Sequence, residues 1–400
     1  MNNFENVIKK IQEIVEKKYF TGAVLKINQN KKNIFSYCFG INDLEKNSLM
    51  KEDLIFRAYS MTKTLTVAAF LTLVDEKKVS LKDPLSKFYP EFKNMKVLDK
   101  NNLDEVIECK NEILISHLLT MTSGFTYFGN KNKTQKETTN LLSNFAKKQN
   151  DKFMNYESFM KKLSEIPLEF EPGTNWKYGL SLDVIAAVIE KITKKSFRDF
   201  VKLKIFEPLK MFDSDFFLKD KSREAKVYEW SLINDEPNLK KIENFNFFIQ
   251  ELDKVPSMPM GGAGLFTTAK DYIKFLDFLL DGKDSKGNKL LSSQILNDMT
   301  KDQLKKIRKN FIWNLNQDYS YGFGVRVRVE NKNYPLTEID EFGWDGLLGS
   351  TALVDPKNRI TMCLMLSSKP GHNKLVESEF FEALYKDLKN NKKINIVEKL

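Results

Sequence analysis

The 400 residues of this chain are enough for one large domain or two interleaved domains. Hydrophobic residues make up 42% and charged residues 30%, a globular composition that excludes wholesale disorder. The net charge of +10 comes from lysines spread along the whole chain, often beside Asn, Asp or Glu. A nucleic-acid binder would cluster this charge on a stripe with interleaved aromatic residues, so we interpret the lysines as solvated faces and expect no nucleic-acid partner.

The sequence also gives no support for a metal-binding, cofactor-binding or membrane-spanning protein. The three cysteines are widely separated and fit neither a disulfide framework nor a CxxC metal site. The two histidines, His117 and His372, argue against a His-rich metal centre, and we expect neither a metal nor a cofactor. The longest apolar runs, such as Val67–Val74, are too short to span a bilayer, so no integral membrane segment is expected.

The first 20 residues predict an amphipathic helix and not a signal peptide. Apolar residues recur at helical spacing from Phe4 to Val15, with charged residues between them. The segment has neither the apolar stretch nor the small-residue cleavage site of an export signal. With no disulfide pattern either, a reducing cytoplasm is the expected location.

Two short strands, Gly22–Asn28 and Asn33–Gly40, are predicted next. A strong helix pattern then runs from Ser60 to about Lys77. From about Leu85 to Pro256 most apolar patterns have a helical period broken by polar loops, and the clearest helix there is Leu182–Ile192.

The last third of the chain changes character. A helix is predicted over Thr268–Leu280, and the alternation of apolar and polar residues in Tyr321–Val329 predicts a half-buried strand. Thr351–Val354 and Ile360–Ser367 are predicted as further strands, followed by a helix from about Leu375 to Leu388.

Strands at both ends with helices between them predict one sheet built from both termini. We expect residues 1–84 and 257–400 to form this sheet domain. Residues 85–256 would be a mainly helical insertion, and the active-site cleft would lie between the two parts.

The first candidate for chemistry is the sequence Ser-Met-Thr-Lys at 60–63. Ser60 and Lys63 lie one turn apart on the same face of a helix start, where free backbone N–H groups and the positive end of the dipole favour negative charge. A serine hydroxyl becomes a good nucleophile when a base takes its proton, and Lys63 is placed to do so. The alternative is a serine helix cap followed by an exposed lysine. The following helix is apolar nearly all round, which predicts burial and favours the catalytic interpretation.

Three more segments bear on the same chemistry. Tyr178, just before the helix Leu182–Ile192, is a candidate proton shuttle or an ordinary half-buried tyrosine. The glycine-rich segment 343–349 is either a plain hairpin or an edge where a backbone N–H pairs with that of Ser60 as an oxyanion hole. The glycines at 261–264 lack the spacing of a nucleotide-binding loop and predict a tight turn bordering the cleft.

In this order the four segments resemble the serine β-lactamase-like superfamily, which includes class C β-lactamases, low-molecular-weight penicillin-binding proteins and family VIII carboxylesterases. The resemblance covers about Gly22 to Leu388. Shorter phrases support it, among them Leu-Leu-Thr-Met-Thr-Ser-Gly at 118–124, Glu-Pro-Gly at 171–173 and Val-Asp-Pro at 354–356. It implies an α+β fold of the β-lactamase/transpeptidase type, with a mainly antiparallel sheet flanked by helices and an all-helical region.

The resemblance also implies roles for single residues. Ser60 would be the acylated nucleophile, with Lys63 and Tyr178 as the groups that handle its proton. The backbone N–H groups of Ser60 and Leu347 would form the oxyanion hole. His117 would belong to a structural packing motif.

Two departures from the family pattern bear on the substrate. Where β-lactamases and peptidases carry Tyr-x-Asn, this chain has Leu180 two residues after Tyr178. Where they carry Lys-Thr-Gly on the substrate-lining strand, it has Trp344, Asp345 and Gly346. These three are the predicted substrate-binding residues. The usual cation for a substrate carboxylate is therefore missing and an acid stands nearby, a form that resembles family VIII esterases.

We therefore expect a serine hydrolase that forms an acyl-enzyme on Ser60 and hydrolyses neutral carboxylic esters. The alternatives are a β-lactamase or D-alanyl-D-alanine carboxypeptidase, and a catalytically weak binding or sensor protein on the same fold. Nucleic-acid binding rests on the diffuse charge alone. The expected partner is a small-molecule ester or amide, while the physiological substrate and the oligomeric state stay open.

Overall fold

The computed structural model describes residues 3–103, 105–147, 155–243, 252–305, 307, 318–371 and 373–397. Within these ranges, eight strands form one antiparallel sheet in the order β10-β11-β12-β13-β14-β1-β2-β3. Their bounds are β1 Gly22–Gln29, β2 Lys32–Asp43, β3 Ser48–Leu49, β10 Tyr319–Tyr321, β11 Arg326–Arg328, β12 Phe342–Gly343, β13 Thr351–Asp355 and β14 Ile360–Met365. This confirms the predicted mainly antiparallel sheet.

The sheet joins the two ends of the chain at its centre. Strand β1 pairs with β14 in a register that runs from Val24 opposite Met365 to Gln29 opposite Ile360. All three N-terminal strands thus lie on one side of this junction and the C-terminal strands on the other. The strands predicted over Gly22–Asn28, Asn33–Gly40, Thr351–Val354 and Ile360–Ser367 are present as β1, β2, β13 and β14.

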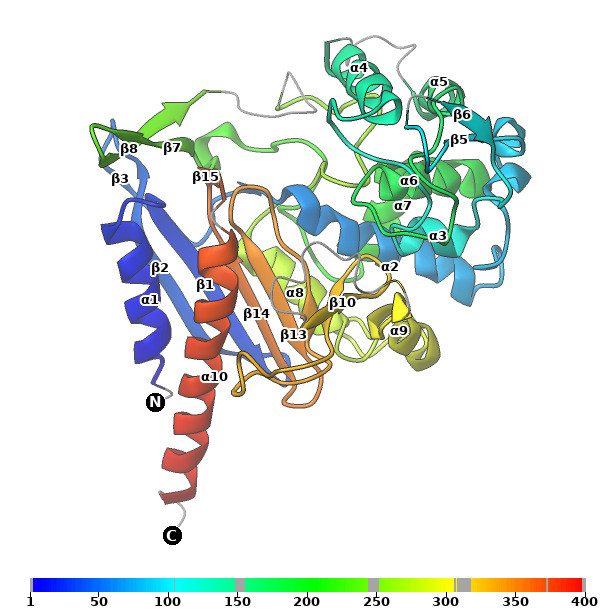
Figure 1. Cartoon of the computed structure of the whole chain (residues 1–400). Helices are drawn as coiled ribbons and strands as arrows, with labels where there is room; N and C mark the ends of the chain where they lie inside the picture. Colours follow the sequence, from blue (N-terminus) through cyan, green and yellow to red (C-terminus); the bar gives the residue numbers. More distant parts are fainter. Residues whose placement is uncertain are drawn as a thin grey trace.

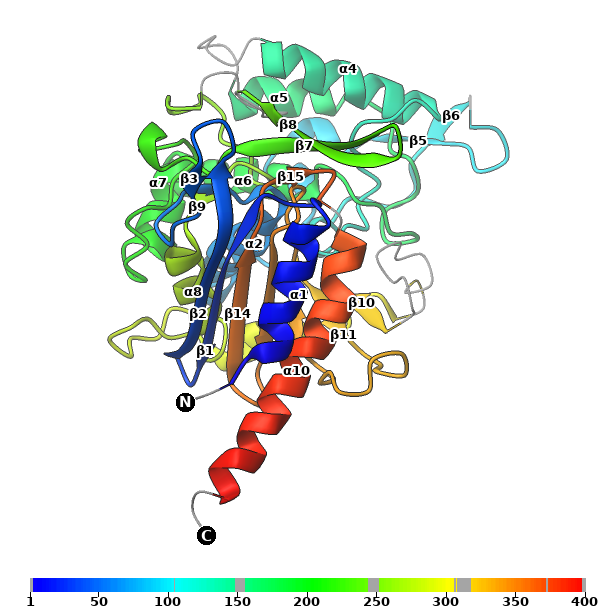
Figure 2. The same cartoon turned by 90° about the vertical axis from the view of Figure 1, so that its left-hand side faces the viewer.

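Each face of the sheet is covered by a pair of helices (Figures 1 and 2). Helices α1 (Glu5–Glu16) and α10 (Asn373–Val397) pack on one face, where they share an apolar cluster with Leu25. Helices α2 (Thr62–Asp75) and α8 (Ala269–Phe278) cover the other face, to which Val24 contributes. Neighbouring residues of β1 enter different cores because successive side chains of a strand point to opposite faces.

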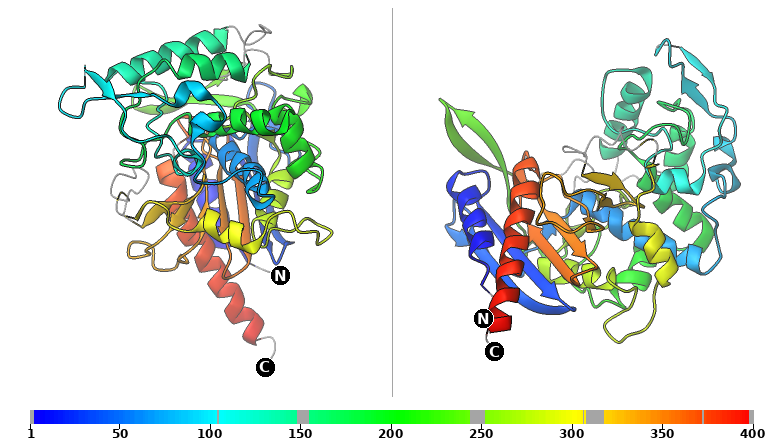
Figure 3. Two further views of the ribbon diagram at one scale, coloured as in Figure 1. Left: turned by 90° about the vertical axis from the view of Figure 1, so that its right-hand side faces the viewer. Right: turned by 60° about the horizontal axis from the view of Figure 1, so that its bottom comes forward.

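A mostly helical region lies on the far side of α2 from the sheet, and Figure 3 shows the same separation from two further directions. Its elements are β5 Lys96–Leu98, β6 Val106–Glu108, α3 Ile115–Leu119, α4 Lys133–Lys147, α5 Tyr156–Leu163, α6 Ser181–Thr193 and α7 Phe197–Val201. The chain returns through a second sheet of order β15-β7-β8, made of β7 Val227–Ile233, β8 Glu236–Ile242 and the C-terminal β15 Ser368–Lys369. The short strands β4 Phe56–Arg57 and β9 Phe266–Thr267 pair with each other, and α9 spans Ser293–Thr300.

One predicted element is wrong. The continuous strand expected over residues 321–329 is a hairpin of β10 and β11, which pair with each other. The Gly322 N–H donates to the Val325 carbonyl at 2.9 Å, and Gly324 has a φ of +68°. A positive φ is the conformation that glycine adopts readily, so the two glycines close a turn inside a segment whose apolar alternation runs on without a break.

Within the described parts of the chain, no helix is both long enough and apolar enough to cross a membrane. The same residues contain no group of three or more His, Cys, Asp or Glu side chains placed to hold a metal ion. His372 lies outside the described residues.

Candidate active site

Ser60 lies at the entrance to the buried helix α2. A single 3₁₀ turn, Tyr59–Met61, precedes the helix, and Tyr59 has a φ of +42°. This conformation is rare for a residue with a bulky side chain and is found where surrounding structure enforces it. All residues from Thr62 to Leu73 are buried, as the sequence predicted. The first backbone N–H groups of such a helix have no acceptor within the helix.

The predicted pair is formed. Lys63 Nζ donates a hydrogen bond to Ser60 Oγ at 3.2 Å and another to the Gly262 carbonyl oxygen at 2.7 Å. The Lys63 side chain is fully buried, while Ser60 is half-buried. Ser60 is therefore accessible from outside and bonded to an amine that bulk water does not reach.

Aromatic rings enclose the Lys63 amine. Its Nζ lies 4.5 Å from the centre of the Tyr178 ring and 5.1 Å from that of Tyr127. The two tyrosine rings meet edge to face, and Trp176 stacks on the other side of Tyr178 at 6.2 Å. The structure thus places the Tyr178 ring against the Lys63 amine, while the role of Tyr178 in proton transfer stays a prediction.

The segment Trp344–Leu347 borders the same place. The Trp344 indole N–H donates to the Tyr178 hydroxyl at 3.3 Å, and its side chain is buried. A Cβ on Gly346 would lie 2.8 Å from the carbonyl oxygen of Ala58, two residues before Ser60, so glycine permits this close approach. Leu347 is 42% exposed beside it. The pairing of the Ser60 and Leu347 N–H groups as an oxyanion hole stays a prediction.

The structure corrects one expectation about Asp345. Its carboxylate accepts a hydrogen bond from Arg326 Nη1 at 2.7 Å and a short one from the Thr351 hydroxyl. The side chains of Arg326 and Asp345 are 2% and 7% exposed, so the two charges balance each other away from water. The acid that the sequence placed near the substrate would have repelled a substrate carboxylate, but in the structure Arg326 neutralises its charge.

Two further groups of the site were missed by the sequence analysis. Asp183, in the first turn of α6, is fully buried and accepts hydrogen bonds from the Gly262 N–H at 2.8 Å and the Tyr127 hydroxyl at 3.4 Å. Burial raises the pKa of Asp183 to about 6, and the nearby charge of Lys63 opposes this rise. The pKa of Tyr127 is raised well above its usual value, first by burial and then by the charge of Asp183.

A signal for Asp183 was present in the sequence, because it is an acid in a helix whose other residues from Ser181 to Ile189 are apolar or small. An acid in the first turn of a helix is also favoured by the helix dipole, so this position alone did not mark a site residue. No comparable signal marked Tyr127, which lies in the loop before α4.

Backbone hydrogen bonds hold the loop that leads into Tyr178. The Lys177 N–H donates to the Met121 carbonyl, and the Gly173 N–H to that of Thr122. A Cβ on Gly173 would lie 2.9 Å from His117 Nε2, so that turn packs directly against the imidazole. His117 Nδ1 accepts from the Leu114 N–H, and burial lowers its pKa. These contacts agree with the packing role implied for His117.

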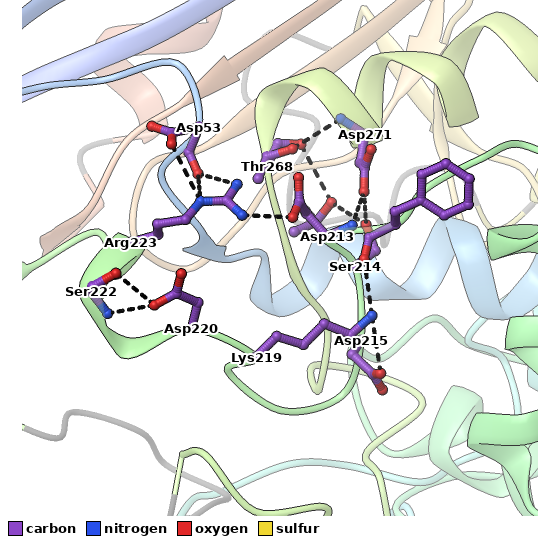
Figure 4. A network of polar contacts seen from close by, with 12 residues as sticks. Asp53, Asp213, Ser214, Asp215, Lys219, Asp220, Ser222, Arg223, Thr268 and Asp271 are labelled. Carbon is purple, nitrogen blue, oxygen red and sulfur yellow. Dashed lines mark hydrogen bonds and ion pairs between the residues drawn. The ribbon is translucent and has the colours of Figure 1, made fainter.

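A polar network fixes the segment that leads into Ser60 (Figure 4). Arg223 donates from Nη1 to Asp213 at 2.7 Å and from Nε to the backbone carbonyl of Asp53 at 2.9 Å. The Asp213 N–H in turn donates to Asp271 of helix α8 at 2.7 Å. These contacts connect the segment before β4 to the part of the chain that follows the helical region, and connect that part to helix α8 on the sheet.

Comparisons with known proteins agree with this architecture. The structure of EstCE1, a hydrolase with promiscuous acyltransferase activity, superposes with a TM-score of 0.77 at 20% identity, covering 95% of this chain and 98% of that one. Unliganded simvastatin synthase (LovD) of Aspergillus terreus gives 0.75 at 20% identity, covering 96% and 98%. The fold is therefore the β-lactamase/transpeptidase-like α+β fold that the resemblance implied.

Relatives are also found by sequence. Protein Rv1367c of Mycobacterium tuberculosis is 26% identical over 373 residues, which are 90% of this chain and 89% of that protein. Esterase EstB of Burkholderia gladioli is 25% identical over 278 residues, covering 66% and 67%. The family description Beta-lactamase matches residues 7–385. Because this match takes in nearly the whole chain, the protein belongs to the beta-lactamase family.

Proposed function

We propose that this protein is a serine hydrolase that forms an acyl-enzyme on Ser60 and acts on neutral carboxylic esters. The observation that carries the proposal is the hydrogen bond of 3.2 Å between Lys63 Nζ and Ser60 Oγ, with the lysine fully buried at the start of α2. A buried amine bonded to a reachable hydroxyl is the arrangement that activates a serine.

Acylation would proceed in two steps, addition to the ester carbonyl and then loss of the alcohol. Ser60 Oγ bonds to the ester carbonyl carbon while its proton moves to Lys63 Nζ, in the form of the enzyme in which this amine is free to accept it. The carbonyl oxygen becomes an oxyanion next to the Ser60 and Leu347 N–H groups. As the carbonyl re-forms, the alcohol leaves with a proton passed through Tyr178 and Lys63, and water later releases the acid by the same route.

The preference for neutral esters rests on Trp344. This residue stands where the family pattern has a lysine, and its buried indole is bonded to Tyr178. Asp345 and Arg326 neutralise each other, so neither adds a free charge for a substrate carboxylate. A charged substrate would lose hydration in an aromatic surrounding without gaining a partner, whereas a neutral ester would not.

The relatives support the ester class. EstB is named an esterase, and EstCE1 is described as a hydrolase with promiscuous acyltransferase activity. The proposal includes a small-molecule substrate and a cytoplasmic location. The cysteines Cys38, Cys109 and Cys363 are free thiols, which is compatible with a reducing compartment.

The test compares kcat/KM for p-nitrophenyl butyrate with that for the p-nitrophenyl monoester of succinate, which carries a carboxylate. The proposal predicts a higher value for the neutral ester and a smaller difference in Trp344→Lys. Trp230→Lys, on the separate strand β7, is the control and should leave the ratio unchanged. A wild-type preference for the anionic ester, or a long-lived adduct with a penicillin, would favour the β-lactamase or peptidase alternative.

A further inference from the structure

The mechanism proposed above leaves one buried charged group unused. Asp183 is fully buried, and its carboxylate is bonded to the Gly262 N–H and the Tyr127 hydroxyl. Neither partner carries a positive charge. Burying a carboxylate without a counter-charge is unfavourable in free energy, so the presence of Asp183 at this position needs a physical reason.

The group that can supply a counter-charge, Lys63, lies across one residue of backbone. Gly262 donates its N–H to Asp183 Oδ1 at 2.8 Å and accepts at its carbonyl oxygen from Lys63 Nζ at 2.7 Å. Asp183 and Lys63 are therefore hydrogen-bonded to the N–H and the carbonyl oxygen of the same residue, Gly262, and both side chains are buried. When Lys63 holds a proton, the attraction between these two opposite charges is stronger in this dry site than it would be in solvent.

The space that a side chain at position 262 would need is occupied by Tyr127 and Asp183. A Cβ there would lie 2.6 Å from the Tyr127 hydroxyl and 2.7 Å from Asp183 Oδ2. The absence of a side chain lets the carboxylate and the tyrosine close over the backbone. The Thr66 hydroxyl fixes the neighbouring Gly261 carbonyl at 2.6 Å, so the segment is held to helix α2.

We propose that Asp183 is a positioning residue that acts through Gly262 and serves as the counter-ion of Lys63 while Lys63 holds the Ser60 proton. The proposal rests on the function proposed above. During acylation the proton leaves Ser60 Oγ and binds Lys63 Nζ, which becomes an ammonium ion in a buried site. Asp183 stays a carboxylate throughout and takes no proton, in the way that an acid behind a catalytic base stabilises the protonated base.

The groups that face Asp183 set its protonation. They are Lys63 of α2, Tyr127 of the loop before α4 and Tyr156 of α5, whose own hydroxyl donates to the Pro259 carbonyl. Burial raises the pKa of Asp183 to about 6. The counter-ion is therefore charged above about pH 6 and neutral below it, so its assistance is lost as the pH falls through this value.

The first experiment measures the pH dependence of kcat/KM for p-nitrophenyl butyrate from pH 5 to 9. In the wild type, the slope of log kcat/KM against pH should steepen by about one below pH 6, because one more group titrates. Asp183→Asn keeps a hydrogen-bond acceptor for Gly262 but removes the charge. It should lower kcat/KM at pH 8 by at least about tenfold, the factor that one pK unit represents, and it should abolish the steepening.

Two control variants separate charge from structure. Asp277→Asn removes another buried carboxylate, bonded to Asn28 and Thr361, whose pKa burial also raises. Its profile should match the wild type. Tyr127→Phe removes one hydrogen bond of Asp183 but leaves its charge, so the steepening should persist.

The inference is overturned if Asp183→Asn retains kcat/KM within twofold and the same profile while the wild type turns over normally. If Asp183→Asn does not fold, a wild-type slope that stays constant through pH 6 overturns it. A wild type that forms no acyl-enzyme at all would instead remove the proposed function, so the two failures are distinguishable.

Discussion

The Trp344 indole N–H donates a hydrogen bond to the Tyr178 hydroxyl at 3.3 Å, and this contact joins two segments that lie 166 residues apart. One comes from the strand that the family pattern assigns to the substrate, and the other from the loop before α6. The indole N–H occupies one side of the hydroxyl oxygen and so restricts the direction in which the hydroxyl points. This direction matters because a hydroxyl can exchange a proton only with groups that it faces.

Trp344→Phe should keep the ring packing and lose this hydrogen bond. A neutral hydrogen bond contributes about 1 kcal/mol, so we expect kcat to fall roughly fivefold with a smaller change in KM. Trp230→Phe, at a tryptophan that packs against Tyr19, is the matched control. Equal kcat values in both variants and the wild type would show that the indole does not orient the tyrosine.

Lys63→Ala and Tyr178→Phe should each slow acylation by about 10²- to 10⁴-fold, the usual contribution of a proton-transferring group. The double variant should be little slower than the worse single variant, because groups that pass one proton act as a unit. Rapid-mixing measurements of the acylation rate check this. Losses that multiply in the double variant would mean that the two residues act independently.

Arg326→Met should destabilise the protein by about 3–5 kcal/mol in urea unfolding, because it leaves Asp345 buried without its partner. Adding Asp345→Asn to this variant should recover a large part of the loss. Lys87→Met, which breaks an exposed pair with Asp83, should change stability by less than about 1 kcal/mol. Similar values for the Lys87 and Arg326 variants would contradict the account of a buried charge pair beneath Trp344.

Much of the fold could be predicted because its signals are local. The apolar run after Lys63 predicted a buried helix, and the structure buries Thr62–Leu73 throughout. The short strand signals near both ends of the chain predicted β1, β2, β13 and β14. The hairpin at residues 322–325 was missed because apolar alternation continues through Gly322 and Gly324, and alternation alone does not distinguish one strand from two paired ones.

In the candidate site, too, the residues with a local sequence signal could be predicted and those placed by tertiary packing could not. Ser60 and Lys63 are three residues apart, so the helical repeat alone places them together. Asp183 and Tyr127 approach Lys63 only through the packing of α6 and a loop against α2, which leaves no local pattern. The partner of Asp345 was missed for a related reason, because Arg326 reaches it across the pairing of β11 with β12.

The central claim is that Ser60 carries the acyl group. Intact-protein mass spectrometry after brief exposure to p-nitrophenyl butyrate measures this directly, with Ser36→Ala as a control because Ser36 also accepts a hydrogen bond from a lysine, Lys26, at 3.1 Å. The account predicts an added butyryl mass on the wild type and on Ser36→Ala, and none on Ser60→Ala. A butyryl adduct that persists in Ser60→Ala, on a protein that hydrolyses the ester at the wild-type rate, would contradict it.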